Sequence, residues 1–100
     1  MELEERLRNC TGFQWDEGNQ DKNWVLHGVH RGEAEQAFFN DPFIVSDDLD
    51  HTEGEERFFL LGQTNSKRLL FIVFTIREDQ IRVISARDMT KSEREVYRTL

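Results

Sequence analysis

The most regular hydrophobic pattern lies in the C-terminal half of the chain, where three apolar runs alternate with short polar connections. Residues 57–63, 68–76 and 81–86 read RFFLLGQ, RLLFIVFTI and IRVISA. Runs rich in β-branched and aromatic residues are typical of strands, and such short connections favour antiparallel hairpins between neighbours. The middle run is apolar at nearly every position, so we expect a central strand that is covered on both faces.

The N-terminal half begins with a weaker pattern that predicts a short strand and then a helix. Phe13 and Trp15 alternate with polar neighbours, as in a half-buried strand. Asp16 can cap a helix that runs to about His27, where Gly28 offers a left-handed stop.

A second helix is predicted in the sequence RGEAEQAFFNDP, where Ala34, Ala37 and Phe38 recur at helical spacing. Pro42 ends it, because the residue before a proline is pushed out of the helical region. The segment FIVSDD, residues 43–48, indicates a short strand or an extended stretch.

The chain closes with a third predicted helix. Thr90 and Glu93 form a capping box, and Val96, Tyr97 and Leu100 give one apolar stripe. The order of elements is therefore strand, helix, helix, three-stranded meander and helix, which indicates an α+β domain with an antiparallel sheet.

Composition narrows the class of protein further. One hundred residues correspond to one domain that can bury a core and fold without disulfide bonds or a structural metal. Cys10 is the single cysteine, so no internal disulfide is expected and a reducing compartment is the simpler interpretation. The opening MELEERLRNC lacks an apolar stretch for a signal peptide or a membrane span, so we expect a cytoplasmic protein without membrane contact.

Charge is distributed unevenly along the chain. The net charge of −7 is unlike that of most nucleic-acid-binding proteins. However, residues 1–56 carry a balance of −11 and residues 57–100 a balance of +4. This asymmetry predicts one surface that attracts anions, although arginines that merely solvate a sheet and a helix would give the same balance.

The acidic stretch DLDHTEGEE, residues 48–56, is the strongest candidate for a metal site and fails the test. Asp48, Asp50 and Thr52 have the spacing that begins a calcium loop, but Gly54 falls one place late and Phe59 occupies the closing glutamate position. No cluster has zinc spacing, and there is no glycine-rich phosphate loop. We therefore expect neither a metal nor a cofactor.

The remaining ionisable residues gather around the meander: His51, Glu55 and Arg57 at its start, and Arg77, Arg82 and Arg87 around its last hairpin. Strand alternation predicts that Arg57 shares a face with Phe59, and that Arg82 lies with Ala86 on the face opposite Arg87.

Those residue types suit RNA cleavage. A histidine beside a carboxylate can transfer protons near neutral pH, and arginines grip phosphate oxygens in bidentate fashion. The residues alone also allow a non-catalytic interpretation, in which Glu55 and Arg57 form an exposed ion pair and His51 is a polar loop residue.

Several motifs in order also resemble the BrnT family, the toxins of bacterial type II toxin–antitoxin pairs. The resemblance covers about residues 13–98, and its strongest parts are HTEGEER at 51–57, ISAR at 84–87 and EREVY at 93–97. It implies a RelE-like fold and a ribonuclease that slows translation. It also implies a BrnA-like ribbon-helix-helix antitoxin, which alone would contact operator DNA.

The resemblance also implies roles for individual residues and a division of the chain. Catalytic roles fall on His51, Glu55, Arg57 and Arg77, and RNA contacts on Thr75, Arg82, Arg87 and Arg94. Residues 13–100 would form the toxin domain and residues 1–12 an extension, in which a short helix with Leu3 and Leu7 on one edge and a disordered segment are both possible.

The chain departs from the family pattern at two positions that are usually basic. They hold Asn19 and Leu26 here. Their loss leaves a second function open, that of a catalytically weakened module that only binds its antitoxin and modulates repression.

Overall fold

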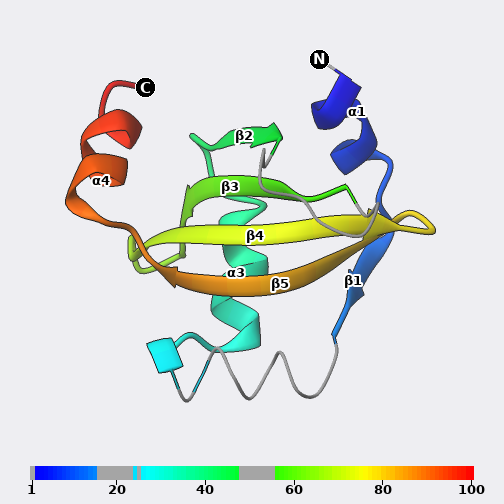
Figure 1. Ribbon diagram of the computed structural model, residues 1–100, viewed down its shortest axis with the longest axis horizontal. Coiled ribbons are helices and arrows are strands. Elements are labelled where there is room, and N and C mark those ends of the chain that lie inside the picture. Colours follow the sequence, from blue (N-terminus) through cyan, green and yellow to red (C-terminus); the bar gives the residue numbers. More distant parts are fainter. Residues whose placement is uncertain (1, 16–23, 25, 48–55) are drawn as a thin grey trace.

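The computed structural model of this protein describes residues 2–15, 24, 26–47 and 56–100, and its centre is one five-stranded sheet (Figure 1). The strands are β1 (Gly12–Gln14), β2 (Ile44–Asp47), β3 (Phe58–Gln63), β4 (Leu69–Arg77) and β5 (Gln80–Asp88). The helices are α1 (Glu2–Arg8), α3 (Arg31–Ala37) and α4 (Lys91–Tyr97). The order of the strands across the sheet is β1-β5-β4-β3-β2.

The predicted α+β class and the antiparallel meander are confirmed. Strands β3, β4 and β5 pair antiparallel in sequence order, and β4 is the central strand of the sheet. Strand β2 adds to β3 in antiparallel fashion, whereas β1 pairs with β5 in parallel. The parallel pairing of β1 with β5 was not predicted, because the two strands are far apart in sequence and no short connection joins them.

Helix α3 covers one face of the sheet, which we call the α3 face; in Figure 1 it lies behind the strands. Ala34 and Ala37 are fully buried in the main core, whose side chains from the strands include Leu60, Ile72 and Phe74. Small residues on the helix bring it so close to β3 that a Cβ on Gly62 would lie 2.8 Å from the Ala37 carbonyl oxygen. The helix ends at Ala37, before the predicted limit at Pro42.

The opposite face, the α4 face, has a smaller core in which Leu61, Met89 and Tyr97 are buried. The predicted capping box is present, since the Glu93 N–H donates to Thr90 Oγ1 at 3.2 Å and the Thr90 N–H donates to Glu93 Oε1 at 2.9 Å. Tyr97 docks the helix through its ring and donates its hydroxyl proton to the Pro42 carbonyl oxygen at 2.6 Å.

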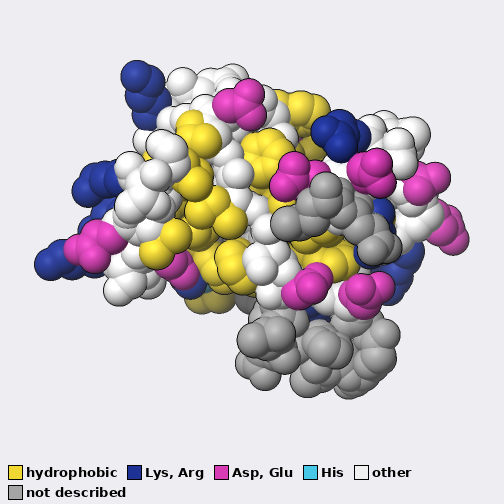
Figure 2. Space-filling view, turned by 90° about the horizontal axis from the view of Figure 1, so that it is seen from above, with side chains coloured by type: hydrophobic (Ala, Val, Ile, Leu, Met, Phe, Trp, Pro, Cys, Tyr) yellow, Lys and Arg dark blue, Asp and Glu magenta, His cyan; other side chains and the backbone are white. Residues whose placement is uncertain are grey.

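The predicted apolar stripe on α4 is wrong for two of its three residues. Val96 is 53% exposed and Leu100 is 58% exposed. A helix of two turns reaches the small α4-face core with one large side chain, so Tyr97 alone is buried. Seen from the β2 edge, apolar side chains reach the surface between α4 and α1 (Figure 2).

A β-bulge in β5 overturns the predicted direction of Arg82. Val73 pairs with Ser85 and Phe74 pairs with Val83, so Ile84 is an extra residue in the ladder. The insertion breaks strict alternation. Arg82 therefore shares the α4 face with Arg87 and opposes the buried Ala86, whereas alternation had predicted the reverse.

Gly28 ends a helical turn as predicted. It has φ of +62°, and its N–H donates to the Trp24 carbonyl oxygen at 2.9 Å. Arg68 then ties this turn to the sheet by donating to the carbonyl oxygens of His27 and Gly28 at 3.0 and 2.8 Å, and to Asp88. The start of the predicted 16–27 helix lies outside the described residues.

The N-terminal extension is helical over Glu2–Arg8, which decides between the two alternatives left open by the sequence. Leu3 is buried and Leu7 packs against the main core. Within the part of the chain that the structure describes, no helix is long and apolar enough to cross a membrane.

Candidate functional site

Three of the predicted site residues lie side by side across the central strands. Thr75 and Arg82 are direct partners in the β4–β5 ladder. Phe58 pairs with Phe74, so the preceding Arg57 lies opposite Thr75 on its other side. We call Arg57, Thr75 and Arg82 the arginine row. It runs across the α4 face near the β4–β5 turn, and the sheet brings it together from positions 25 residues apart in sequence.

Arg77 adds a further cation beside this row. It is exposed and lies two residues beyond Thr75 on β4, hence on the same face. Three guanidinium groups thus project from one end of the α4 face. A concentration of planar, permanently charged donors suits a phosphate-bearing ligand.

Thr75 is the buried centre of the row, with 3% of its surface exposed. Its Oγ1 donates a hydrogen bond of 2.7 Å to the Glu56 carbonyl oxygen. The single hydroxyl proton is thereby used inside the protein. Thr75 consequently fixes the backbone just before Arg57, and its predicted RNA contact would have to use the remaining acceptor capacity of the oxygen.

Arg57 is half-buried, and its Nε is shielded from solvent without a hydrogen-bond acceptor among the described residues. Leaving a buried donor unsatisfied costs about 1–3 kcal/mol, so such an atom calls for an explanation. Because Nε has almost no accessible surface, an anion could accept from it only if the Arg57 side chain moved.

The remaining catalytic predictions, His51 and Glu55, lie outside the described residues. What the structure describes is the end of that segment, where Glu56 and Arg57 enter β3. The proposed proton-transfer pair therefore stays a prediction from the sequence.

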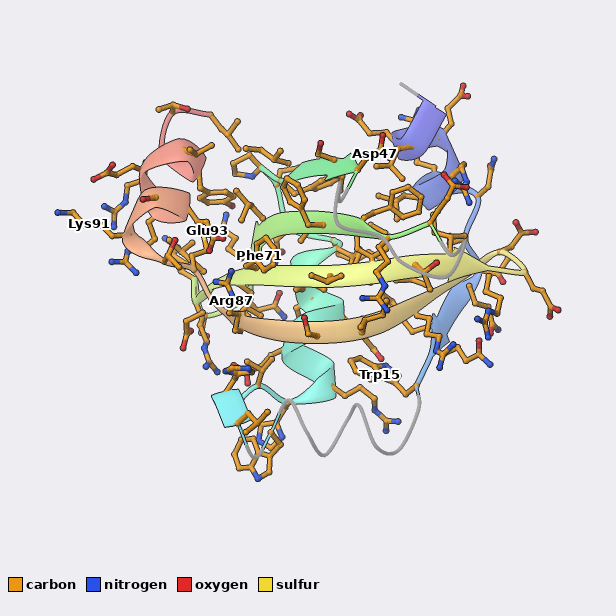
Figure 3. All side chains as sticks on the ribbon, viewed as in Figure 1. Trp15, Asp47, Phe71, Arg87, Lys91 and Glu93 are labelled. Carbon is orange, nitrogen blue, oxygen red and sulfur yellow. The ribbon has the colours of Figure 1, made fainter. Side chains whose placement is uncertain are left out.

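Arg87 lies at the other end of the same face, against α4 (Figure 3). Its Nη1 and Nη2 donate to Glu93 Oε1 and Oε2 at 2.8 and 3.0 Å, and its guanidinium stacks 4.2 Å from the centroid of the Phe71 ring. The hydrogen bonds from Arg87 are the main reason that the pKa of Glu93 is lowered. Phe71 is four residues from Thr75, so about 13 Å of strand separates Arg87 from the arginine row.

Arg94 also has an internal partner, since its Nη1 donates to the Met89 carbonyl oxygen at 2.9 Å. Arg87 and Arg94 both attach α4 to the end of β5. The structure therefore brings together Arg57, Thr75, Arg77 and Arg82, and holds the other two predicted RNA contacts apart from them.

Among the described residues, no group of three or more His, Cys, Asp or Glu side chains could hold a metal ion. A hollow of about 350 Å³ lies next to the Glu56 corner and is lined by Arg6, Asp47 and Glu56 together with Phe58. The sequence contained no signal for Arg6 in this position, because a half-exposed arginine on a short helix has no periodic pattern to reveal it.

Comparisons with known proteins agree with this architecture. The crystal structure of the Brucella abortus ribonuclease toxin BrnT superposes with a TM-score of 0.55 at 20% identity, covering 80% of this chain and 97% of that one. This likeness supports the fold. No curated protein sequence is similar enough to count as a match. The model of the family described as "Ribonuclease toxin, BrnT, of type II toxin-antitoxin system" matches residues 15–93. The chain therefore belongs to the BrnT family of ribonuclease toxins.

Proposed function

We propose that this chain is an active, metal-independent endoribonuclease that cuts RNA at the arginine row and thereby slows translation and growth. The observation that carries the proposal is the row of Arg57, Thr75 and Arg82 on one face of the sheet, in which Arg57 Nε has no acceptor among the residues that the structure describes. The family match supports ribonuclease activity, and the row supports its location.

The chemistry requires three contributions that the named residues can supply. A base removes the proton of the RNA 2′-hydroxyl, which attacks the adjacent phosphorus, and an acid protonates the leaving 5′-oxygen. His51 and Glu55 are the proposed pair for these proton transfers. Arg57, Arg77 and Arg82 would stabilise the additional negative charge of the phosphorane. No step of this reaction requires a metal ion or a cofactor.

A type II toxin is controlled by an antitoxin, and membership of the family implies such a partner here. We propose a BrnA-like antitoxin with a ribbon-helix-helix end that represses the shared operon. The net charge of −7 fits a toxin that meets operator DNA only through that antitoxin. A substrate and partner of this kind place the proposed activity in the cytoplasm.

Induced expression in a bacterial host tests the proposal, with growth and total RNA followed together for wild type, His51→Ala and Arg57→Ala. Arg98→Ala is a matched control, because Arg98 is an exposed arginine at the end of α4. Wild type and the control should arrest growth and fragment RNA, while the two site variants should do neither. Cleavage by purified protein should persist in EDTA, and loss of cleavage there would contradict metal independence.

A second candidate is the weakened module that binds its antitoxin without cutting RNA. Leu26, which is 62% exposed where a basic residue is usual, favours it because a cation is missing from the surface. Folded wild-type protein that binds the antitoxin, leaves RNA intact and permits normal growth would replace the nuclease proposal by this one.

A further inference from the structure

Helix α1 lies outside the residues that the family match covers, yet it packs against the corner that leads into β3. Leu3 is 8% exposed and belongs to the main core together with Val45 and Phe58. The helix therefore has a fixed place beside β2 and β3. A helix from outside the matched residues therefore contacts the segment that leads into the proposed site.

Arg6 is the residue of α1 that contacts the corner itself. Its guanidinium carbon lies 5.2 Å from the centroid of the Phe58 ring, within the range of a cation–π contact. Its Nη1 lies 3.8 Å from Glu56 Oε1. Arg6 thus contacts the residue on each side of Arg57.

The same corner is held from the sheet by Thr75. Glu56 accepts the Thr75 hydroxyl at its carbonyl oxygen, while Arg6 approaches its carboxylate. Phe58 is 2% exposed and anchors the other end in the core. The segment around Arg57 is thus held by a threonine of β4 at the Glu56 carbonyl and contacted by an arginine of α1 at the side chains of Glu56 and Phe58.

We propose that Arg6 is a positioning residue for the reaction: by holding Glu56 and Phe58, it fixes the guanidinium of Arg57 where the scissile phosphate of RNA binds. The inference rests on the proposed nuclease function and adds an element from outside the matched domain to its site. A displacement of a catalytic group by about 1 Å can cost up to 100-fold in rate, so a contact that holds the two neighbouring residues has a measurable effect.

If Arg6 positions Arg57 and does not bind RNA, its substitution should change kcat and leave KM unchanged. Arg6→Ala should lower kcat for cleavage of a defined RNA about tenfold, with KM unchanged, because the ground-state contacts to RNA remain. Arg6→Lys should recover most of kcat, since an ammonium group can still meet Glu56 and the Phe58 ring.

Arg8→Ala is the matched control. Arg8 is two residues along the same helix, is exposed, and lines a different hollow on the other side of α1. It removes the same charge without touching the corner, so kcat should equal that of wild type. Hydrogen–deuterium exchange of a peptide covering 56–63 should rise in Arg6→Ala and stay unchanged in Arg8→Ala.

The outcomes separate this inference from the function on which it rests. If wild type cleaves RNA and Arg6→Ala does so with the same kcat, the inference is overturned alone. An equal loss in Arg8→Ala, or a rise in KM with kcat preserved, also overturns it, because it would indicate a charge effect or a direct RNA contact. Folded wild-type protein that leaves RNA intact overturns the nuclease function and this inference together.

Discussion

Two ends of the α4 face carry the same type of side chain in opposite circumstances. At one end, Arg57 presents an Nε without an acceptor among the described residues. At the other, Arg87 is engaged by both oxygens of Glu93 and by the Phe71 ring. The difference lies in what each guanidinium touches and not in residue type or face.

How strongly an arginine on a sheet attracts an anion depends on whether it is already paired with a carboxylate. A guanidinium that is paired with a carboxylate contributes little net charge to an approaching phosphate, because the pair is close to neutral at a distance. The interactions of such a paired guanidinium, here Arg87, instead stabilise the packing of α4 on the sheet. For Arg57 no ion pair with a carboxylate is present among the described residues, and we expect the two ends to separate into a reactive end and a structural end.

The largest expected effect is on catalysis at the reactive end. Arg57→Ala should lower kcat for RNA cleavage by about 100-fold or more, since removal of one preorganised donor typically costs this much. Arg57→Lys should recover only part of the loss, because an ammonium group lacks the planar fork of donors. Steady-state cleavage of a fluorogenic RNA measures both variants, and equal activity of wild type and Arg57→Ala would remove Arg57 from the site.

The next effect is on stability at the structural end. Arg87→Ala should lower the free energy of unfolding by about 1–3 kcal/mol, since it breaks two charge-assisted hydrogen bonds in a half-buried pair. Urea unfolding followed by tryptophan fluorescence measures the change. A double cycle with Glu93→Gln should show that the two losses are not additive, and additive losses would argue against a direct coupling.

Thr75 links the two kinds of effect. Thr75→Val should lower the free energy of unfolding by about 1 kcal/mol, because it removes the hydrogen bond to the Glu56 carbonyl oxygen. It should also lower kcat several-fold, as the backbone before Arg57 loosens. Thr75→Ser keeps the hydroxyl and serves as the control; a Thr75→Val variant with wild-type kcat would show that this hydrogen bond does not matter for the site.

The smallest effect is a dependence of stability on pH. The hydrogen bonds from Arg87 hold the pKa of Glu93 below its usual 4.5, so the ionised carboxylate is favoured in the folded state. The stabilisation is therefore present above pH 4.5 and is lost as the pH falls through the lowered pKa of the folded state. Asp88 behaves in the same direction through Arg68. Urea midpoints of Glu93→Gln should fall less steeply on acidification than those of wild type, and parallel curves would contradict this origin.

The fold was largely predictable because its signals are local. The three apolar runs, the capping box at Thr90 and the helix stop at Gly28 each depend on a few consecutive residues. The failures depend on tertiary packing. The bulge at Ile84 leaves no mark in the local sequence of β5, and the burial of Tyr97 but not Val96 depends on which part of the sheet α4 meets.

The sequence predicted which residues belong to the site but not how they are arranged in space. Counting arginines selected Arg57 and Arg87 alike, because the sequence does not reveal that Glu93 folds back onto the end of β5. Arg6 was missed for the same reason, since its partners lie about fifty residues away in sequence. Contacts between distant segments decide which cations are available, and they become visible only in the folded chain.

The most direct test compares Arg57→Ala with Arg87→Ala in one assay, with single-turnover cleavage of a defined RNA and urea unfolding measured on the same preparations. The account predicts that Arg57→Ala loses about 100-fold in rate with its free energy of unfolding nearly unchanged. Arg87→Ala should instead lose stability while retaining most of its rate, measured where both variants are folded. Equal losses of rate in the two variants would contradict the division of the α4 face into a reactive and a structural end.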